Sequence, residues 1–495
     1  MGKKTSIALA FIFSLFVTAQ AIYPQNMTDF PRLTPDPRAL EYFRQGSRGY
    51  TWEELAEISL WASGDTGASN MQVINNAVIT LNNSGNLPAN EREKAEYILT
   101  FMHANFLRIY SIYQTRVDTI FSNGRFNCVS SAVLYMILCK SAGINSSGVM
   151  TRDHAFVTVH INGEDIDVET TNRFGFDPGN RREFHDELGR VTGFSYVPAQ
   201  NYRDRQTITQ IELISLIMNN RVAELERANR YAEAVPLSID RFALLSGASL
   251  ADEGILPTGV IFSDPRADLI DRLVNYGAFL LRAAREEAAL EWALAASEIY
   301  PETERWAEFS LAAINNRIAR LMRERRAQDA RIFLENNRAL IPAENYTQFD
   351  TALTDSELYT MANQVNSAAE AELVLAAVEQ ALNTGRMEQR RADELITFTV
   401  MKIAASLSAP PQRDWREAIQ YLEAAISRYG ENRDFQQAVQ TYWNNIATDY
   451  HNRFAAEWNR RNYEEAERIL NEGLEEFPTN RQLLADMEVV NRNRR

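Results

Sequence analysis

Apolar residues in the first third of the chain recur mainly at helical spacing. Two short patterns predict helices over Thr51–Ser63 and Asn70–Leu81, and a longer one predicts a helix from Glu91 to Tyr110, where apolar residues return every three or four positions. Another helix is expected from Cys128 to Ala142, because the next residue, Gly143, is of the type that commonly ends a helix in a left-handed conformation. Helix therefore dominates this part of the chain before any strand begins.

The pattern then changes to alternation, which predicts a β-hairpin. Two alternating runs, Ala155–Ile161 and Glu164–Thr170, flank Asn162-Gly163, a dipeptide typical of two-residue hairpin turns. Such a turn fixes the pairing of the two strands and therefore decides which side chains share a face. A three-residue turn would reverse that assignment.

With a two-residue turn, one face of the hairpin is apolar and the other is polar. Val157 would face Val168 and Val159 would face Ile166, so we expect this face to be buried against the core. The opposite face carries His154, Phe156, Thr158, His160, Asp165, Asp167, Glu169 and Thr171. Titratable side chains therefore gather on one side of a single hairpin.

Glu169 is the predicted partner of His154, because the two are diagonal neighbours on the polar face. Asp167 shares that face but lies about 13 Å of strand from His154, at ~3.3 Å per residue. His160 would meet Asp165 beside the turn, where a solvated surface pair is expected. An imidazole held by a carboxylate is the arrangement that a general base requires.

From about Ile208 onward the apolar spacing is helical nearly throughout, and an acidic residue followed by alanine recurs. The recurring pairs are Glu233-Ala234, Glu287-Ala288, Asp329-Ala330, Glu370-Ala371, Glu417-Ala418 and Glu465-Ala466. Their alanines are 54, 42, 41, 47 and 48 residues apart, and such periods are typical of stacked helical hairpins. The units that begin at Asp414 and Asn462 resemble tetratricopeptide repeats, although the period exceeds about 34 residues. An ordinary helical domain without repeats is the alternative.

Composition and charge exclude several classes of protein. The chain has 495 residues, with 51 Lys and Arg against 66 Asp and Glu, which gives a formal charge of −15. No Lys- and Arg-rich tract stands out, so we expect no nucleic-acid partner. A hydrophobic share of 45% with 21 Gly and 15 Pro is typical of a folded, helix-rich chain and not of a disordered one.

The first 21 residues have the pattern of a secretory signal peptide. Lys3 and Lys4 precede an apolar run over Ile7–Val17, and Ala19-Gln20-Ala21 is the small-x-small pattern of a cleavage site. The run is shorter than the ~20 apolar residues of a membrane span, and no later stretch comes closer. We therefore expect an exported protein, periplasmic or secreted, with no stable membrane span after cleavage near Ile22.

Cysteine use adds to that expectation, because exported proteins usually place their cysteines in disulfides. The two cysteines of this chain, Cys128 and Cys139, lie 11 residues apart in one predicted helix, which is about 16 Å at 1.5 Å per residue. A disulfide needs about 4.4–6.8 Å between Cα atoms. Free thiols in an oxidising compartment indicate a role for at least one of them, and Cys139 is interpreted as core filling.

Cys128 stands in the first turn of its predicted helix. The buried stripe of that helix is predicted to be Val129, Ala132, Val133, Met136 and Ile137. A thiol at a helix N-terminus is stabilised as the thiolate by the helix dipole, and the thiolate is the nucleophile in cysteine catalysis. The alternative is a small buried core residue, which free cysteines often are. The predicted pair of His154 and Glu169 favours the nucleophile.

No metal or cofactor is predicted. The other histidines, His103, His185 and His451, show no metal-ligand spacing among themselves. No Asp/Asn/Gly-rich loop of the calcium-binding type occurs either.

In their order along the chain, these motifs resemble the transglutaminase-like core of the papain-like cysteine enzymes. The matching segments are Asn127-Cys128-Val129-Ser130-Ser131-Ala132, Gly143-Ile144, His154-Ala155-Phe156-Val157-Thr158-Val159 and Val168-Glu169-Thr170-Thr171. The resemblance covers about residues 95–180. It implies that Cys128 attacks an amide carbonyl and forms a thioester, that His154 transfers the proton and that Glu169 orients His154. Phe156 stands where the family often has tryptophan, and Glu169 where aspartate is usual.

The oxyanion donors are not defined by a motif. The backbone N–H of Cys128 is the first candidate, and the side chain of Gln114 is the second.

The sequence thus predicts a helix-dominated α+β chain in four parts. These are a signal peptide (1–21), a helical lead-in (22–90), a small transglutaminase-like domain of helix plus antiparallel sheet (91–206) and an all-α helical-repeat solenoid (207–495). The first hypothesis is an exported cysteine acyl-transfer enzyme that hydrolyses or transamidates a peptide or protein substrate, with a protein partner in the repeat groove. The second is a catalytically inactive transglutaminase-like fold that serves as a protein-binding scaffold, and a third is a structural envelope protein.

Overall fold

The computed structural model describes residues 30–65, 67–83, 85–151, 154–178, 205–247, 264–301, 303–411 and 413–493. The predicted signal peptide and His185 lie outside these ranges. The predicted site residues Cys128, His154, Glu169 and Gln114 all lie inside them.

The first third of the chain folds into helices close to those predicted. They are α1 Pro37–Gln45, the short 3-10 helix η2 Gly46–Arg48, α2 Trp52–Ser63, α3 Ala68–Asn83, α4 Glu91–Asn105, α5 Asp118–Asn123 and α6 Cys128–Ser141. Three of the predicted helices are confirmed to within two residues at each end, as α2, α3 and α6. Gly143 follows α6 with a φ of +81°, which is the left-handed conformation expected of it.

The helix predicted to reach Tyr110 ends earlier, at Asn105. Ile109–Tyr110 instead forms β1, which pairs in parallel with β2, Arg125–Phe126. Backbone N–H groups at the start of β1 donate to the Gly124 carbonyl at 3.0 Å. Apolar spacing continues past Asn105, so the prediction was wrong here because pairing with a distant segment overrides the local pattern.

A four-stranded antiparallel sheet contains the hairpin. Its strands are β3 Asn145–Met150, β4 Ala155–Ile161, β5 Glu164–Val168 and β6 Gln206–Ile208, in the order β5-β4-β3-β6. The hairpin register is confirmed, since all facing residues, such as Val157 and Val168, are the predicted pairs. Asn162 and Gly163 have φ of +52° and +86°, the left-handed conformation that a two-residue turn of this type requires. β5 ends two residues before Thr170, the predicted end.

The strand β3 was not predicted, although it lies between β4 and β6. Its first four residues, Asn145 to Gly148, carry no large apolar side chain, so alternation gives no signal. Gly148 is required by close packing, because a Cβ there would lie 2.8 Å from Ile208 Cγ1 and 3.0 Å from Leu213 Cβ. The strand β3 is therefore defined by its pairing with β4 and β6, and not by the pattern of its own side chains.

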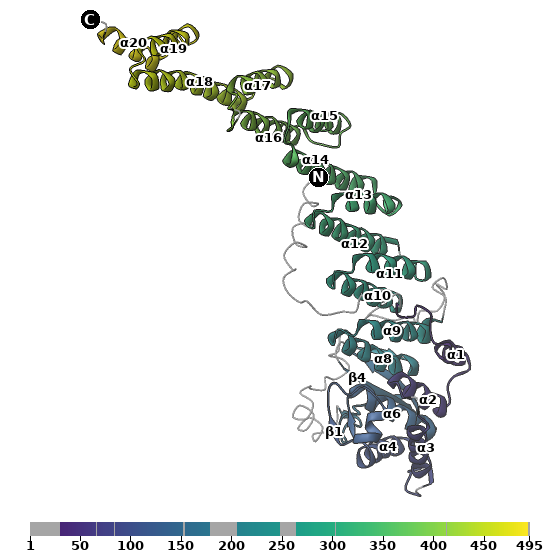
Figure 1. The fold of residues 1–495 in the computed structure, drawn as a ribbon. Coiled ribbons are helices and arrows are strands. Elements are labelled where there is room, and N and C mark those ends of the chain that lie inside the picture. Colours follow the sequence, from purple (N-terminus) through teal and green to yellow (C-terminus); the bar gives the residue numbers. More distant parts are fainter. Residues whose placement is uncertain are drawn as a thin grey trace. The chain divides into compact units, whose positions relative to one another are not determined.

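Helix α6 is buried on all sides, and not along one stripe as predicted. All residues from Val129 to Cys139 are buried. Helix α6 contacts α2, α4, β3 and β4, as well as α8, Gln210–Arg227, and Figure 1 shows it at the centre of this part of the chain. A helix that is apolar all round belongs inside a core. Only the ends of the helix are half-buried, Cys128 at its start and Lys140 and Ser141 at its end.

The rest of the described chain is a series of helical hairpins. Its helices are α8 Gln210–Arg227, α9 Tyr231–Ser246, α10 Pro265–Arg282, α11 Glu286–Ile299, α12 Thr303–Arg323, α13 Ala327–Asn336, η5 Arg338–Leu340, α14 Ala343–Gln364, α15 Ala368–Asn383, α16 Gln389–Ser408, α17 Trp415–Tyr429, α18 Arg433–Asn459, α19 Tyr463–Glu476 and α20 Arg481–Asn493. Successive helices pack in pairs, such as α8 with α9, α16 with α17 and α18 with α19. A helical-repeat-like region is thus confirmed.

The recurring alanine has a defined place in this region. It is the fourth residue of α9, α13, α15, α17 and α19, and it is buried in each of them. In α11 the fourth residue is the buried Ala289, one position after the predicted Ala288. The recurring pattern thus places a small, buried residue at the same position of each of these helices.

A common turn also recurs between helices, although no residue type marks it. In this region, five described non-glycine residues that lie two positions before a helix have φ between +46° and +64°: Asn229, Ala284, Arg325, Arg413 and Arg461. Because their side chains differ, the sequence pattern gave no sign of this turn.

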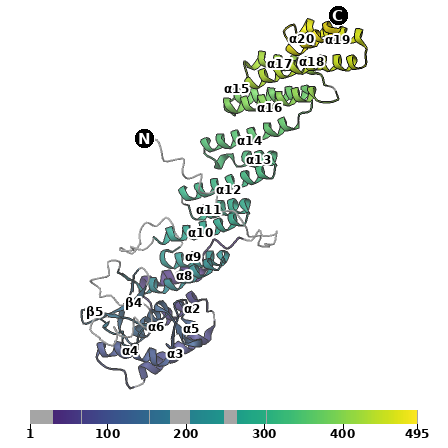
Figure 2. The same ribbon diagram turned by 90° about the vertical axis from the view of Figure 1, so that its left-hand side faces the viewer.

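The chain divides into two compact units, one ending at Ala313 and one starting at Ile314. In the first unit, α8 belongs to the same hydrophobic core as α2, α4 and α6, and Figure 2 shows α8 next to α6 and β4. The predicted domain boundaries at residues 90 and 206 stay predictions. Within the described ranges, none of the helices has the length and apolar character to cross a membrane.

Candidate active site

Cys128 is the first residue of α6, as predicted. The helix is capped by Asn127, whose Oδ1 accepts from the Ser130 N–H at 3.0 Å, while Ser130 Oγ accepts from the Asn127 N–H at 3.0 Å. This reciprocal capping box fixes the backbone on both sides of Cys128. As the first N–H of a helix, that of Cys128 has no carbonyl partner within the helix.

The segment before α5 is tied to the first turn of α6. Asn127 Nδ2 donates to the Ile112 carbonyl at 3.2 Å, and Ser130 Oγ donates to the Gln114 carbonyl at 3.0 Å. Gln114, which the sequence suggested as a side-chain oxyanion donor, is half-buried and lies beside this turn. Its role and that of the Cys128 N–H stay predictions.

His154 lies between the other two predicted site residues. Its Nε2 is 2.5 Å from Oε2 of Glu169, and its side chain is only 9% exposed. The same imidazole interacts electrostatically with the Cys128 side chain. With Nε2 on the carboxylate, Nδ1 is the ring nitrogen that can serve the thiol. The structure therefore brings Cys128, His154 and Glu169 together in one chain of contacts.

A tight turn after β5 orients the Glu169 carboxylate. Its Oε1 accepts from the Thr171 N–H at 3.1 Å and from Thr171 Oγ1 at 2.7 Å, and the side chain is fully buried. The Glu169 N–H donates to the Gly175 carbonyl at 2.7 Å. A Cβ on Gly175 would lie only 1.9 Å from the Glu169 carbonyl oxygen, so the turn admits no side chain there.

The buried pair is held in its charged form. Burial acts to lower the pKa of His154, but the charge of Glu169, the interaction with Cys128 and the hydrogen bond with Glu169 raise it well above the ordinary value of 6.5. Burial likewise acts to raise the pKa of Glu169, but His154 and Thr171 hold it below the ordinary value of 4.5. An imidazolium beside a carboxylate is thus the expected state near neutral pH.

A further histidine supports this turn from α4. His103 Nε2 lies 3.0 Å from the carbonyl oxygen of Thr170, and burial lowers the pKa of His103 to about 4. The neutral ring therefore donates its Nε2 proton to that carbonyl. On the other side, Thr170 Oγ1 is 2.9 Å from Ser131 Oγ of α6. The residue next to Glu169 is thus anchored to two helices, a role for His103 that its spacing in the sequence did not indicate.

The other acids of the hairpin have partners of their own. Asp167 faces Thr158, whose Oγ1 donates to it at 2.8 Å, and the Arg205 guanidinium donates to both Asp167 oxygens at 2.6 and 2.7 Å. His160 contacts Asp165 at 2.7 Å, and their side chains are 40% and 74% exposed. The solvated surface pair predicted for His160 is confirmed. In these contacts, the partners of Asp167 are Thr158 and Arg205, and not His154.

Tyr110 is a neighbour of the site that the sequence did not indicate. It interacts electrostatically with both Cys128 and Glu169. Its ring packs edge-on against Phe126, with 5.8 Å between ring centroids. The apolar spacing had placed Tyr110 in a helix, and only the pairing of β1 with β2 brings it beside α6.

The second cysteine is part of the core, as expected. Cys139 is fully buried, and burial raises the pKa of its thiol to about 12. Both cysteines are free thiols. In the part of the chain that the structure describes, no three His, Cys, Asp or Glu side chains gather in a group able to hold a metal ion.

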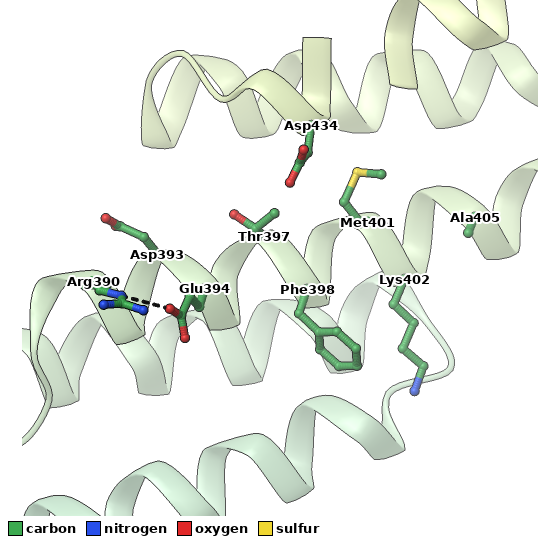
Figure 3. A pocket seen from close by; sticks show the side chains of 9 residues that line it. All are labelled: Arg390, Asp393, Glu394, Thr397, Phe398, Met401, Lys402, Ala405 and Asp434. Atoms are coloured by element: carbon green, nitrogen blue, oxygen red, sulfur yellow. Dashed lines mark hydrogen bonds and ion pairs between the residues drawn. The ribbon is translucent and has the colours of Figure 1, made fainter. Parts of the chain in front are cut away.

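The second unit has an open hollow of about 950 Å³ beside α16. Its lining residues, drawn in Figure 3, are Arg390, Asp393, Glu394, Thr397, Phe398, Met401, Lys402 and Ala405 of α16 and Asp434 of α18. Phe398 is 38% exposed, and its ring lies 6.1 Å from that of Tyr359 on α14, which is 47% exposed. This face of the repeats thus combines exposed aromatic rings with charges of both signs.

Comparisons with known proteins add little to this geometry. No protein-family model matches the chain, and no curated protein matches it. Among solved structures, one of menin, described as revealing the binding site for the Mixed Lineage Leukemia (MLL) protein, is similar over 84% of this chain and 93% of that chain. The identity is 12% and the TM-score is 0.30, so this likeness supports no statement about the function of the chain.

Proposed function

We propose that this chain is an exported cysteine acyl-transfer enzyme of the transglutaminase-like type, which acts on amide groups of a peptide or protein through a thioester on Cys128. One observation supports the proposal above the others. The Cys128 thiol stands at a helix N-terminus and interacts with an imidazole, His154, whose Nε2 lies 2.5 Å from the buried carboxylate of Glu169. A nucleophile, a base and an orienting acid are the three parts that acyl transfer requires.

In the acylation step, the thiolate of Cys128 adds to the carbonyl carbon of the amide. The new S–C bond forms as the carbonyl π electrons move to oxygen, which gives a tetrahedral oxyanion. When the oxyanion collapses, the C–N bond breaks and His154 gives its Nδ1 proton to the departing amine. The acyl group remains on sulfur as a thioester, and His154 is left neutral.

In the second step, neutral His154 takes a proton from water or from an incoming amine as that group attacks the thioester carbonyl. The C–S bond then breaks and the thiolate returns. Glu169 keeps one tautomer and orientation of the imidazole through both steps and stabilises the imidazolium that forms. Hydrolysis and transamidation use the same residues, so both belong to the proposal.

The test is the rate of alkylation by iodoacetamide between about pH 4 and about pH 9, on wild type, Cys128→Ala, Cys139→Ala and His154→Ala. We expect Cys128 to react far faster with iodoacetamide than Cys139, which is buried. His154→Ala should slow this reaction about 10- to 100-fold at the acidic end, because the thiolate then loses its imidazolium partner. Cys139→Ala should leave the rate unchanged, since that thiol is buried.

Slow labelling of Cys128 that does not depend on His154 would overturn the proposal that the chain is an enzyme. The second hypothesis would then apply, a catalytically inactive fold that works as an exported binding scaffold. The hollow beside α16, with the exposed rings of Phe398 and Tyr359, is the observation that favours a protein partner for the repeats. Both hypotheses share export, which mass spectrometry of the mature N-terminus checks.

A further inference from the structure

We propose that the hydroxyl of Tyr110 is an oxyanion donor at the Cys128 site, donating a hydrogen bond to the substrate carbonyl oxygen as Cys128 Sγ adds to the carbonyl carbon. This inference rests on the proposed function and adds a catalytic residue to it. It gives Tyr110 the part that the sequence suggested for the side chain of Gln114.

The backbone holds Tyr110 beside the strand that leads into α6. Tyr110 pairs in parallel with Phe126, two residues before Cys128, and the two rings pack edge to face at 5.8 Å and 82°. The next N–H, that of Ser111, donates to the Phe126 carbonyl at 2.8 Å. Because Asn127 also donates to the Ile112 carbonyl, β1 and the residues after it are fixed to the start of the helix. Tyr110 is thus positioned by the same contacts that position Cys128.

The surroundings of the Tyr110 side chain fit a donor to a developing negative charge. The side chain is half-buried and interacts with the charges of both Cys128 and Glu169. Among the described residues, none is hydrogen-bonded to the Tyr110 hydroxyl. The hydroxyl is also not one of the buried polar atoms that lack a partner. A phenol that interacts with Cys128 and Glu169 and has no described protein partner can donate a hydrogen bond to a substrate oxygen.

The protonation state is also suitable. Burial first, and then the negative charges of Cys128 and Glu169, raise the pKa of Tyr110, so the phenol keeps its proton throughout the working range. In the tetrahedral intermediate, the former carbonyl oxygen carries the negative charge, and the Cys128 N–H and the Tyr110 O–H would be its two donors. No proton leaves Tyr110 in this scheme, because the hydroxyl only donates a hydrogen bond.

Two reagents separate this role from the reactivity of the thiol itself. p-Nitrophenyl acetate acylates Cys128 through a tetrahedral oxyanion and releases p-nitrophenolate, whereas iodoacetamide alkylates the same sulfur by direct displacement without an oxyanion. Both rates would be measured on the full chain for wild type, Cys128→Ala, Tyr110→Phe, Gln114→Ala and Tyr113→Phe. Tyr113 is a matched control, because it lies three residues on and is 68% exposed.

For Tyr110→Phe we expect acylation of Cys128 to fall about 100-fold, the usual effect of removing one oxyanion donor. Alkylation should change less than about twofold, because the variant keeps the ring and loses only the hydroxyl that the displacement does not use. Retained alkylation also shows that the site is still folded. Tyr113→Phe should change neither rate.

The failures are distinguishable. If wild type is acylated no faster than Cys128→Ala, the proposed function itself fails. If wild type is acylated rapidly and Tyr110→Phe matches it, the proposed function stands and the role of Tyr110 is overturned. A loss confined to Gln114→Ala would assign the donor to Gln114, and an equal loss of both rates in Tyr110→Phe would show that Tyr110 only supports the fold.

Discussion

At the scale of single residues, the pair of His154 and Glu169 links the chemistry of the site to the stability of the first unit. The two are almost fully buried, 2.5 Å apart and charged. Removing one partner of a buried pair leaves the other charge uncompensated, which costs about 3 kcal/mol or more. The proposed catalytic pair therefore also has a structural role, and its contribution to stability must depend on pH.

The pH dependence of the stability follows from the pKa shifts of Glu169 and His154. The pKa of Glu169 is lowered, so its contribution is present above the ordinary value of 4.5 and is lost as pH falls through the folded value. The pKa of His154 is raised, so its contribution is present below the ordinary value of 6.5 and is lost as pH rises through the folded value. We expect Glu169→Gln to lower the free energy of unfolding by about 3 kcal/mol between those two values, and by less on either side.

The measurement uses Cys139 as the reporter, because this fully buried thiol lies in the core of the first unit. The rate at which Cys139 reacts with 4,4′-dithiodipyridine would be measured at increasing urea concentrations. With Cys128→Ala in all variants, Cys139 is the reacting thiol and reports unfolding of the first unit. A stability difference between Glu169→Gln and its parent that stays constant with pH would contradict the charged pair.

At the scale of elements, the turn from Glu169 to Gly175 sets the direction of the carboxylate. Gly175→Ala would place a Cβ 1.9 Å from the Glu169 carbonyl oxygen, so the turn has to shift. Since a displacement of about 1 Å in a reacting group can cost about 100-fold, we expect alkylation of Cys128 to fall toward the His154→Ala rate. Gly163→Ala is the control: it has a φ of +86° but nothing within 4 Å, so it adds strain without a clash. Equal rates in the two variants would contradict this role of the turn.

Elements with a strong local signal were predictable from the sequence. The hairpin β4–β5 combines alternation with an Asn-Gly turn, and its register, hence the meeting of His154 with Glu169, followed from those two facts. β3 and the pair β1–β2 had no such signal, because long-range pairing and the close packing at Gly148 create them. For the same reason Tyr110 and His103 were missed, since each reaches the site only through contacts between distant segments.

At the scale of the whole molecule, α8 packs both against the next helix, α9, and into the core around α6. The predicted repeat region starts at residue 207, yet Ile214, Ile217 and Met218 of α8 are fully buried in the core that surrounds α6. Burying each such side chain contributes about 1.5–3 kcal/mol. Their sum is comparable with the about 5–15 kcal/mol by which a whole domain is stable. The helix that begins the repeats is thus part of the fold that carries Cys128.

Two shortened chains test this dependence. A chain that ends at Arg323 keeps α8 to α12, and we expect it to retain rapid alkylation of Cys128 and full protection of Cys139. A chain that ends at Arg205 loses α8, and we expect its Cys139 to be alkylated as fast as in urea, because the core around α6 is opened. Protection of Cys139 in the shorter chain would contradict this account of α8. Loss of Cys128 reactivity in the longer one, with Cys139 still protected, would mean that the site depends on residues beyond Arg323.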